Sequence, residues 1–112
     1  MYTSTRTETE GQRQRSRHSD CVPVKVSAHE KEVEVCISKT KFMVPEDMHV
    51  SEFVFYVRGF MTVDRSQSVF FFTRDPPVLL PMNATMRSLW IQQRSDTDHV
   101  LHVTFRKEDT FG

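Results

Sequence analysis

The sequence predicts a single α+β domain of the β-grasp type, with a four-stranded mixed sheet around one main helix and a short second helix. Two observations lead to this fold class. Several short apolar segments have the character of strands, and one longer segment repeats its apolar residues at helical spacing. Their order is two strands, a helix, a strand, a short helix and a final strand. A chain of 112 residues has room for one domain and one core.

The first half of the chain contains three strand-forming pieces. They are rich in valine and alternate apolar with polar residues, at 22–26, 33–37 and 41–44. In the second piece the apolar residues Val33, Val35 and Ile37 share one face. The simplest arrangement is a half-buried hairpin between this piece and residues 40–44.

Residues 50–61 are predicted to form the main helix. Apolar side chains recur at positions 50, 53, 54, 57, 60 and 61, which places them on one helical face. Gly59 lies inside this segment and weakens a helix by about 1 kcal/mol. The prediction therefore depends on an apolar stripe that faces the sheet.

The second half of the chain supplies the remaining elements. Residues 68–73 form a short continuous apolar run, which is typical of a central strand buried on both faces. Asn83 is the expected N-cap of a short helix through residues 84–93. Residues 99–105 form the last strand, and its alternation sets Leu101, Val103 and Phe105 on one face. In this topology the first and last strands lie side by side in the middle of the sheet.

Composition and charge exclude several classes of function. The 15 basic and 15 acidic residues give no net charge, so nothing draws the chain as a whole to nucleic acid. Arg58-Gly59-Phe60 begins like the base-stacking motif of RNA-recognition domains, but the match stops there, and the segment has helical spacing. No nucleic-acid partner is expected.

No catalytic or metal centre is expected either. Cys21 and Cys36 form no ligand set with the five scattered histidines, and His99 and His102 are interpreted as solvated or edge residues. No nucleophile elbow or phosphate-binding glycine loop is present, so no enzyme activity and no cofactor are predicted. Residues 1–20 are polar and are predicted to be a mobile segment ahead of a domain at 21–112. Without a secretory signal, the expected location is cytoplasmic.

Five stretches together resemble a known family. They are CVPVKV at 21–26, KFMVPEDMHVSEFVFYVR at 41–58, VFFF at 69–72, NATM at 83–86 and EDTFG at 108–112. In this order they resemble the ubiquitin-like autophagy modifiers, the family of GABARAP and the microtubule-associated light-chain proteins. The resemblance covers about residues 20–112 and implies a ubiquitin-like β-grasp fold.

The resemblance also implies a fate for the C-terminal glycine. Gly112 is expected to be adenylated by an activating enzyme, passed as a thioester to a conjugating enzyme, and joined to phosphatidylethanolamine. A processing and deconjugating cysteine protease is expected to recognise Phe111 and Gly112. The lipidated form is then expected on autophagosomal membranes.

Peptide binding is the second property that the resemblance implies. Receptor peptides with an aromatic-x-x-aliphatic motif are expected to add as a strand beside residues 40–44. The pocket for the aromatic side chain is expected to comprise Glu10, Pro23, Lys25, Lys41, Met43 and Val100. The pocket for the aliphatic side chain is expected to comprise Phe42, Val44, Pro45, Met48, Phe53 and Tyr56. Cys21, Lys25 and Phe60 depart from the family pattern, and the expected consequence is an altered peptide preference.

Two alternatives remain open from the sequence. The first is a ubiquitin-like modifier whose glycine is joined to a protein lysine. The second is an adaptor that binds peptides and is never conjugated.

Overall fold

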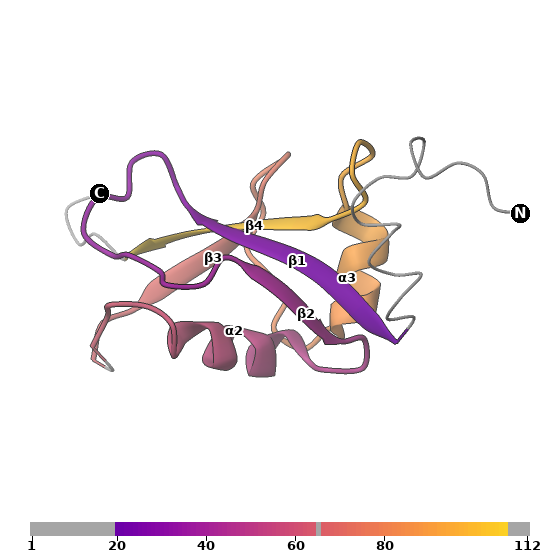
Figure 1. Cartoon of the computed structure of the whole chain (residues 1–112), viewed down its shortest axis with the longest axis horizontal. Coiled ribbons are helices and arrows are strands. Elements are labelled where there is room, and N and C mark those ends of the chain that lie inside the picture. The colour runs from indigo at the N-terminus through magenta and orange to yellow at the C-terminus, as the bar shows by residue number, and fades with distance from the viewer. Residues whose placement is uncertain (1–19, 65, 108–112) are drawn as a thin grey trace, which may run out of the picture.

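The computed structural model describes residues 20–64 and 66–107. These residues form four strands and two helices: β1 (Cys21–Ala28), β2 (Lys41–Pro45), α2 (Val50–Arg58), β3 (Val69–Thr73), α3 (Met86–Gln93) and β4 (Leu101–Lys107). The element order is the predicted one, which confirms the α+β class. In Figure 1 the strands form one layer, α2 runs along one face of it, and α3 lies at one end.

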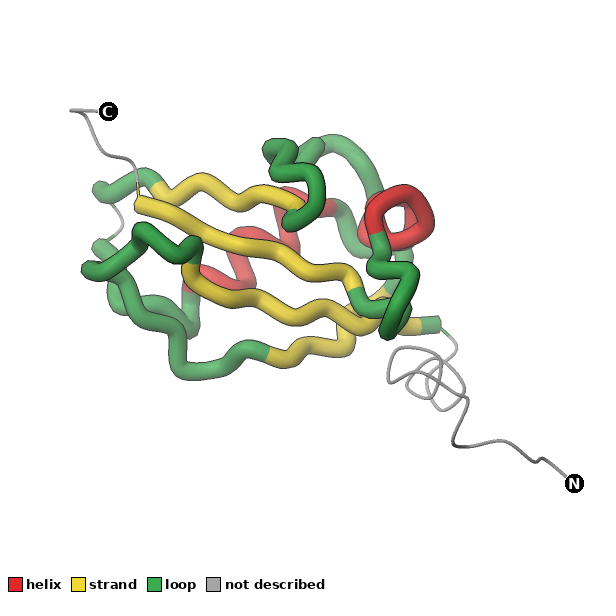
Figure 2. The backbone as a smooth tube through the Cα atoms, turned by 90° about the horizontal axis from the view of Figure 1, so that it is seen from above, coloured by secondary structure: helices red, strands yellow, loops and turns green. Residues whose placement is uncertain are grey.

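The four strands form one mixed sheet in the order β2-β1-β4-β3. β1 pairs with β2 in antiparallel and with β4 in parallel orientation, and β3 pairs with β4 in antiparallel orientation. The prediction that the first and last strands are neighbours in the middle is therefore confirmed. Figure 2, seen from above, shows the strands side by side.

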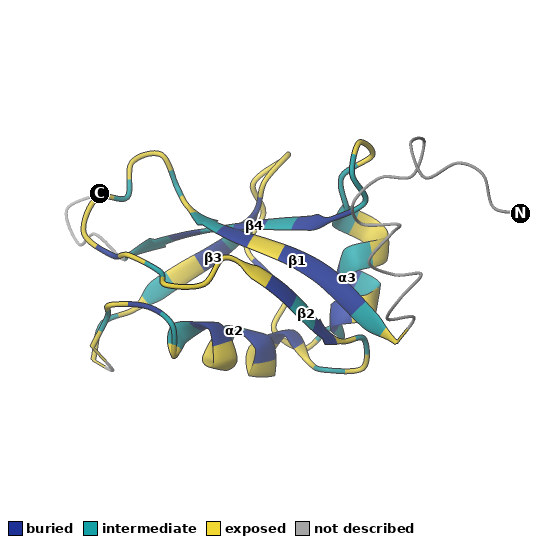
Figure 3. Cartoon of the chain, in the orientation of Figure 1, coloured by how far each residue is buried: buried dark blue, intermediate teal, exposed yellow. Residues whose placement is uncertain are grey.

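The core lies between the sheet and α2. In the middle strands every second residue is buried, as in Leu101, Val103 and Phe105 of β4. α2 contributes Val50, Phe53 and Val57, all of which are fully buried. Figure 3 shows the buried side of α2 turned toward the sheet and its exposed side turned away. Burying each such side chain contributes about 1.5–3 kcal/mol, so the apolar stripe holds the helix in place.

The intervening residues of the strands lie on the opposite face of the sheet, here called the outer face. It carries Lys25 of β1, Met43 of β2 and His102 of β4, because each alternates with core residues of its strand. The two faces of β2 therefore differ, with the core on one side and these partly polar side chains on the other.

The predicted hairpin between residues 33–37 and 40–44 is wrong, because β2 pairs with β1 and residues 33–37 form no strand. Val33 is 86% exposed, whereas Val35 is buried. The Glu32 carboxylate accepts the backbone N–H groups of Glu34 and Val35, at 2.9 Å each. Since these N–H groups are already bonded locally, they cannot form the ladder hydrogen bonds that a hairpin with residues 40–44 would need.

The main helix ends at Arg58 and not at residue 61 as predicted. Gly59 is its C-cap, and the Gly59 N–H bonds back to the Tyr56 carbonyl oxygen at 3.2 Å. Met61 then forms an isolated bridge with Ile37. Phe60 and Met61 still pack against the core, so their apolar character fitted the helical stripe although they lie beyond the helix.

The run at residues 68–73 forms β3, but β3 is an edge strand and not the predicted central strand. Phe71 is fully buried, whereas Phe70 is 42% exposed. A loop pairs along the free edge of β3, so part of its backbone is hydrogen-bonded on that side as in a central strand. The Thr73 N–H donates to the Val78 carbonyl oxygen, and the Leu80 N–H donates to that of Phe71.

Two further boundaries differ from the prediction. The short helix is capped by Thr85, whose hydroxyl oxygen accepts the Ser88 N–H at 3.2 Å, and not by Asn83. A hydroxyl at position 85 reaches the first-turn N–H groups of this helix, whereas Asn83 lies in the preceding turn. The last strand spans residues 101–107 in place of 99–105, with the predicted faces.

Candidate functional site

β2 offers the open edge of the sheet. The order of the strands places β2 and β3 at the two edges. The backbone of residues 78–80 forms hydrogen bonds with Phe71 and Thr73 and so covers the free edge of β3. Among the strands that the structure describes, none pairs with the corresponding side of β2. Within the described part of the chain, β2 is therefore the edge at which an extended peptide can extend the sheet.

The backbone of Met43 points to this open edge. Pairing is alternate in an antiparallel ladder, and the Val26 N–H donates to the Thr40 carbonyl oxygen at 2.8 Å. Residues 40, 42 and 44 thus bond toward β1, and the register sets Met43 opposite Pro23, which has no N–H to donate. The N–H and C=O of Met43 lie on the side away from β1, where an added strand can pair with them.

A cavity of about 380 Å³ opens on the outer face beside β2. It brings together five of the six residues expected to hold an aromatic side chain: Pro23, Lys25, Lys41, Met43 and Val100. Lys39, Asp98 and His102 also line it. A volume of this size accommodates one aromatic ring with its near surroundings. The sixth residue, Glu10, lies outside the described residues.

Most of the residues expected to hold an aliphatic side chain lie on the other side of β2, toward α2. Phe53 is fully buried, and Phe42 and Val44 are 3% and 2% exposed. These three can form only the floor of a surface. Met48 is half-buried and Tyr56 is exposed, and they form its accessible part. Pro45, the exposed last residue of β2, alternates with Val44 and so lies toward the outer face.

Phe60, which departs from the family pattern, forms an aromatic cluster with Phe42 and Tyr56. Its ring meets Phe42 and Tyr56 edge to face, with centroid distances of 5.6 and 5.4 Å. The Lys39 ammonium lies 5.0 Å from the Phe42 ring centroid and 5.5 Å from that of Phe60. Cation–π attraction therefore holds Lys39 between the α2 side and the cavity.

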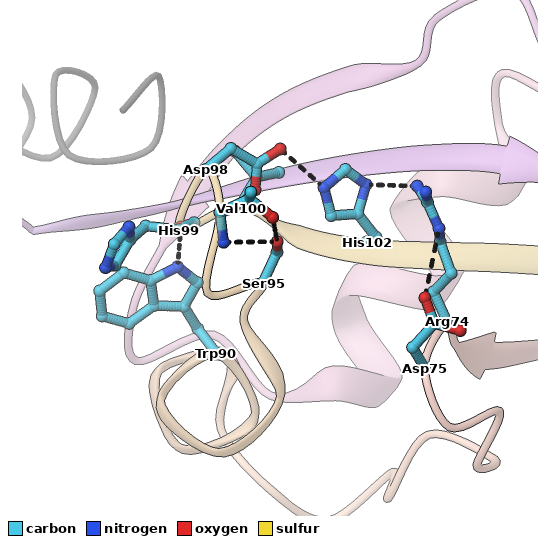
Figure 4. A network of polar contacts seen from close by, with 9 residues as sticks. Arg74, Asp75, Trp90, Ser95, Asp98, His99, Val100 and His102 are labelled. Carbon is cyan, nitrogen blue, oxygen red and sulfur yellow. Dashed lines mark hydrogen bonds and ion pairs between the residues drawn. The ribbon is translucent and has the colours of Figure 1, made fainter. Parts of the chain in front are cut away.

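His102 belongs to a network that the sequence analysis missed. Its Nε2 lies 2.9 Å from Oδ2 of Asp98, and its Nδ1 lies 3.2 Å from the Arg74 guanidinium (Figure 4). Because a guanidinium only donates, Nδ1 is the acceptor and Nε2 carries the proton. The interpretation of His102 as a solvated or edge residue is wrong, since β4 is an inner strand and the side chain is 16% exposed.

The Asp98 carboxylate is tightly held by its neighbours. Its Oδ1 accepts the Val100 N–H at 2.9 Å. Partial burial raises the pKa of Asp98, but the hydrogen bonds from Val100 and His102 outweigh it and keep the pKa below its ordinary value. Trp90 anchors the same loop by donating to the His99 carbonyl oxygen at 2.8 Å (Figure 4). This part of the cavity wall is thus fixed before any ligand binds.

A second carboxylate, that of Glu32, organises the opposite end of β4. It accepts the Lys107 N–H at 2.6 Å in addition to the two loop N–H groups. The Lys107 ammonium also pairs with Glu34. Burial raises the pKa of Glu32, but the hydrogen bonds from Lys107, Val35 and Glu34 outweigh it and hold the pKa below 4.5.

Replacing Glu32 by glutamine should destabilise the protein at neutral pH by about 1–2 kcal/mol, because an amide nitrogen cannot accept the loop N–H groups. A carboxylate whose pKa is depressed in the folded state stabilises that state fully above its unfolded-state pKa. This stabilisation is lost as the pH falls through the folded-state pKa. Denaturant unfolding at several pH values should show the wild type and Glu32→Gln converging below pH 4.5. The exposed Glu30→Gln is the control. Curves that stay parallel to pH 3 would contradict this role.

Three observations complete the description. Phe111 and Gly112, expected to be recognised by the protease, lie outside the described residues. Across residues 20–64 and 66–107, no three His, Cys, Asp or Glu side chains are grouped as a metal site, and neither Cys21 nor Cys36 forms a disulfide. The helices in this part of the chain are too short or too polar to span a membrane.

Comparison with known proteins identifies the family. The model of the family described as autophagy protein Atg8, ubiquitin-like, matches residues 6–112. The chain is 33% identical to Autophagy-related protein 8B of Oryza sativa subsp. indica, over 85% of this chain and 77% of that one. It is 34% identical to Autophagy-related protein 8 of Colletotrichum lindemuthianum, over 85% and 76%.

Solved structures agree with these relatives. The crystal structure of Trypanosoma brucei ATG8 superposes with a TM-score of 0.78 at 26% identity, covering 91% of this chain and 85% of that one. Plasmodium falciparum Atg8, solved in complex with an Atg3 peptide, has the same fold, with a TM-score of 0.73 at 19% identity and 88% coverage of both chains. The chain belongs to the Atg8 family of ubiquitin-like autophagy proteins.

Proposed function

We propose that this autophagy modifier is conjugated through Gly112 to phosphatidylethanolamine on autophagosomal membranes and recruits receptor peptides by strand addition at β2. The observation that carries the peptide-binding part is the open edge of β2 between two different surfaces. The cavity lies on its outer face, and the surface formed by Met48 and Tyr56 lies on its α2 side.

The spacing of an aromatic-x-x-aliphatic motif fits this arrangement. Side chains three positions apart in an extended strand point to opposite faces. A peptide paired with Met43 therefore places its aromatic side chain on one face of the extended sheet and its aliphatic one on the other. If the aromatic enters the cavity, the aliphatic meets the α2 side, where the aromatic cluster forms an apolar floor.

Family membership and the chemistry of glycine support the conjugation. A carboxylate is a poor acylating agent, and adenylation by an activating enzyme gives it a good leaving group. Transfer of the acyl group to a conjugating enzyme's thiol and then to the lipid amine forms a thioester and finally an amide. Glycine has no Cβ to obstruct these transfers.

The proposed partners follow from the two functions. They are the activating and conjugating enzymes, a processing and deconjugating cysteine protease, and receptor peptides. The related Plasmodium falciparum Atg8 was solved with an Atg3 peptide, which supports peptide engagement in this family. With no net charge on the chain, membrane attachment should depend on the acyl chains of the conjugated lipid.

Reconstituted conjugation tests this function. The full chain is incubated with the activating and conjugating enzymes of its own cascade, ATP, and liposomes with or without phosphatidylethanolamine. The expected product is a lipid amide at Gly112, identified by mass spectrometry and formed only with phosphatidylethanolamine. A lysine adduct would instead establish a protein modifier, and no adduct at all would favour an unconjugated adaptor.

A further inference from the structure

Among the described residues, the lining of the cavity beside β2 is predominantly basic. It comprises three lysines, Lys25, Lys39 and Lys41, and one carboxylate, that of Asp98. Both oxygens of that carboxylate are already bonded, one to the Val100 N–H and the other to His102. A bound ring that carries an anionic group would compensate these ammonium groups with a full charge, whereas an unsubstituted ring offers only the weaker cation–π attraction.

Of the three lysines, Lys25 belongs to β1 and lies on the outer face of the sheet. It is opposite Lys41 in the register of β1 with β2. The alternation fixed by Val26 and Thr40 makes this a non-hydrogen-bonded pair, in which opposing side chains are closest. Like charges placed in this way destabilise a sheet. Within the described part of the chain Lys25 is exposed and forms no ion pair.

The register also shows where an inserted ring would end. An added strand lies beside β2, so a ring entering the cavity crosses the outer face from Met43 toward β1 and β4. The neighbours of β1 at this level are Lys41 on one side and His102 on the other, both paired with Lys25. A six-membered ring that enters in this direction points toward the position of Lys25, so a para substituent would extend toward its ammonium.

We propose that this cavity selects peptides whose inserted aromatic residue carries an anionic group at its far end, which in a protein is phosphotyrosine, and that Lys25 is the residue that recognises it. The inference rests on the proposed strand addition at β2. A phosphate there pairs with the Lys25 ammonium through a charge-assisted hydrogen bond. The His102 ring, fixed by Asp98 and Arg74, forms the adjoining wall.

Isothermal titration of the full chain with three matched peptides tests the proposal. The peptides share an aromatic-x-x-aliphatic sequence and differ only in having tryptophan, tyrosine or phosphotyrosine at the aromatic position. Lys25→Gln removes the proposed contact. Lys31→Gln makes the same change of charge on an exposed loop residue away from the cavity and is the matched control.

The wild type should bind the phosphotyrosine peptide about tenfold more tightly than the tyrosine peptide, the effect of one charge-assisted hydrogen bond. Lys25→Gln should bring the two affinities within about threefold, and Lys31→Gln should retain the preference. Equal or weaker binding of phosphotyrosine by the wild type, or a preference that survives Lys25→Gln, overturns the inference. If the tyrosine and tryptophan peptides bind in that case, strand addition stands. If no peptide binds, strand addition fails with it.

Discussion

Replacing Gly112 by alanine should lower the rate of lipid conjugation at least about 100-fold, since a methyl group beside the reacting carbonyl displaces it from the geometry that acyl transfer requires. The measurement is the initial rate of amide formation with the activating and conjugating enzymes and phosphatidylethanolamine liposomes. Adenylate and thioester formation, followed separately, should show which transfer the methyl group obstructs.

The matched control for this experiment is Thr110→Ala, which removes a nearby side chain and leaves the glycine intact. Its conjugation rate should be close to that of the wild type. Peptide affinity should be unchanged in both variants, because Gly112 is not among the residues that form the β2 edge. Membrane recruitment of Gly112→Ala at the wild-type level would show that attachment does not proceed through this residue.

Replacing Met43 by proline should weaken binding of an aromatic-x-x-aliphatic peptide by at least about tenfold, the value of one lost backbone hydrogen bond together with a steric conflict. Proline removes the N–H that points to the added strand, and its ring occupies that position. The β1–β2 ladder should survive, since Met43 pairs with Pro23 at a position without ladder hydrogen bonds. Calorimetric titration with the full chain measures the effect.

Met43→Ala separates the backbone from the side chain in this test. Alanine removes the methionine from the cavity wall but keeps the N–H, so its loss of affinity should be clearly smaller than that of proline. Both variants should unfold at similar temperatures. Equal affinities for the proline and alanine variants would mean that peptides bind here without extending the sheet.

The topology was predictable because local patterns coincide with tertiary demands over most of the chain. The alternation of β4 matches its buried face, and the stripe through Phe53 and Val57 matches the helix that covers the sheet. The central pairing of β1 with β4 followed from the β-grasp topology that these elements predicted. Periodicity therefore sufficed where burial alone decides the structure.

The failed predictions occur where hydrogen bonds, and not the burial of apolar side chains, determine the backbone pairing. The alternation at 33–37 is that of a strand, but Glu32 binds the N–H groups that a hairpin would need. The apolar run of β3 is typical of a central strand, but β3 is an edge strand whose free edge is covered by the loop at 78–80. In both places the competing partner is a local or a loop group that hydrophobic periodicity does not report.

The candidate site could likewise be predicted only in part from the sequence. Five residues of the predicted aromatic pocket come from three separate segments, and only the resemblance to the family could bring them together. The hydrogen bonds of His102 with Asp98 and Arg74 were not predictable, because Arg74 is 28 positions away and becomes a neighbour only through the pairing of β3 with β4. Asp98 and His102 are four residues apart, which in this loop-to-strand segment gave no signal.

Amide chemical-shift mapping tests the central claim most directly. The uniformly nitrogen-15-labelled full chain is titrated with an unlabelled aromatic-x-x-aliphatic peptide. The largest shifts should fall within residues 40–57, and the Met43 amide should become protected from solvent exchange as it enters a new ladder. No response at residues 40–57, or shifts confined to β3 and α3, would show that the open edge of β2 is not where this protein receives peptides.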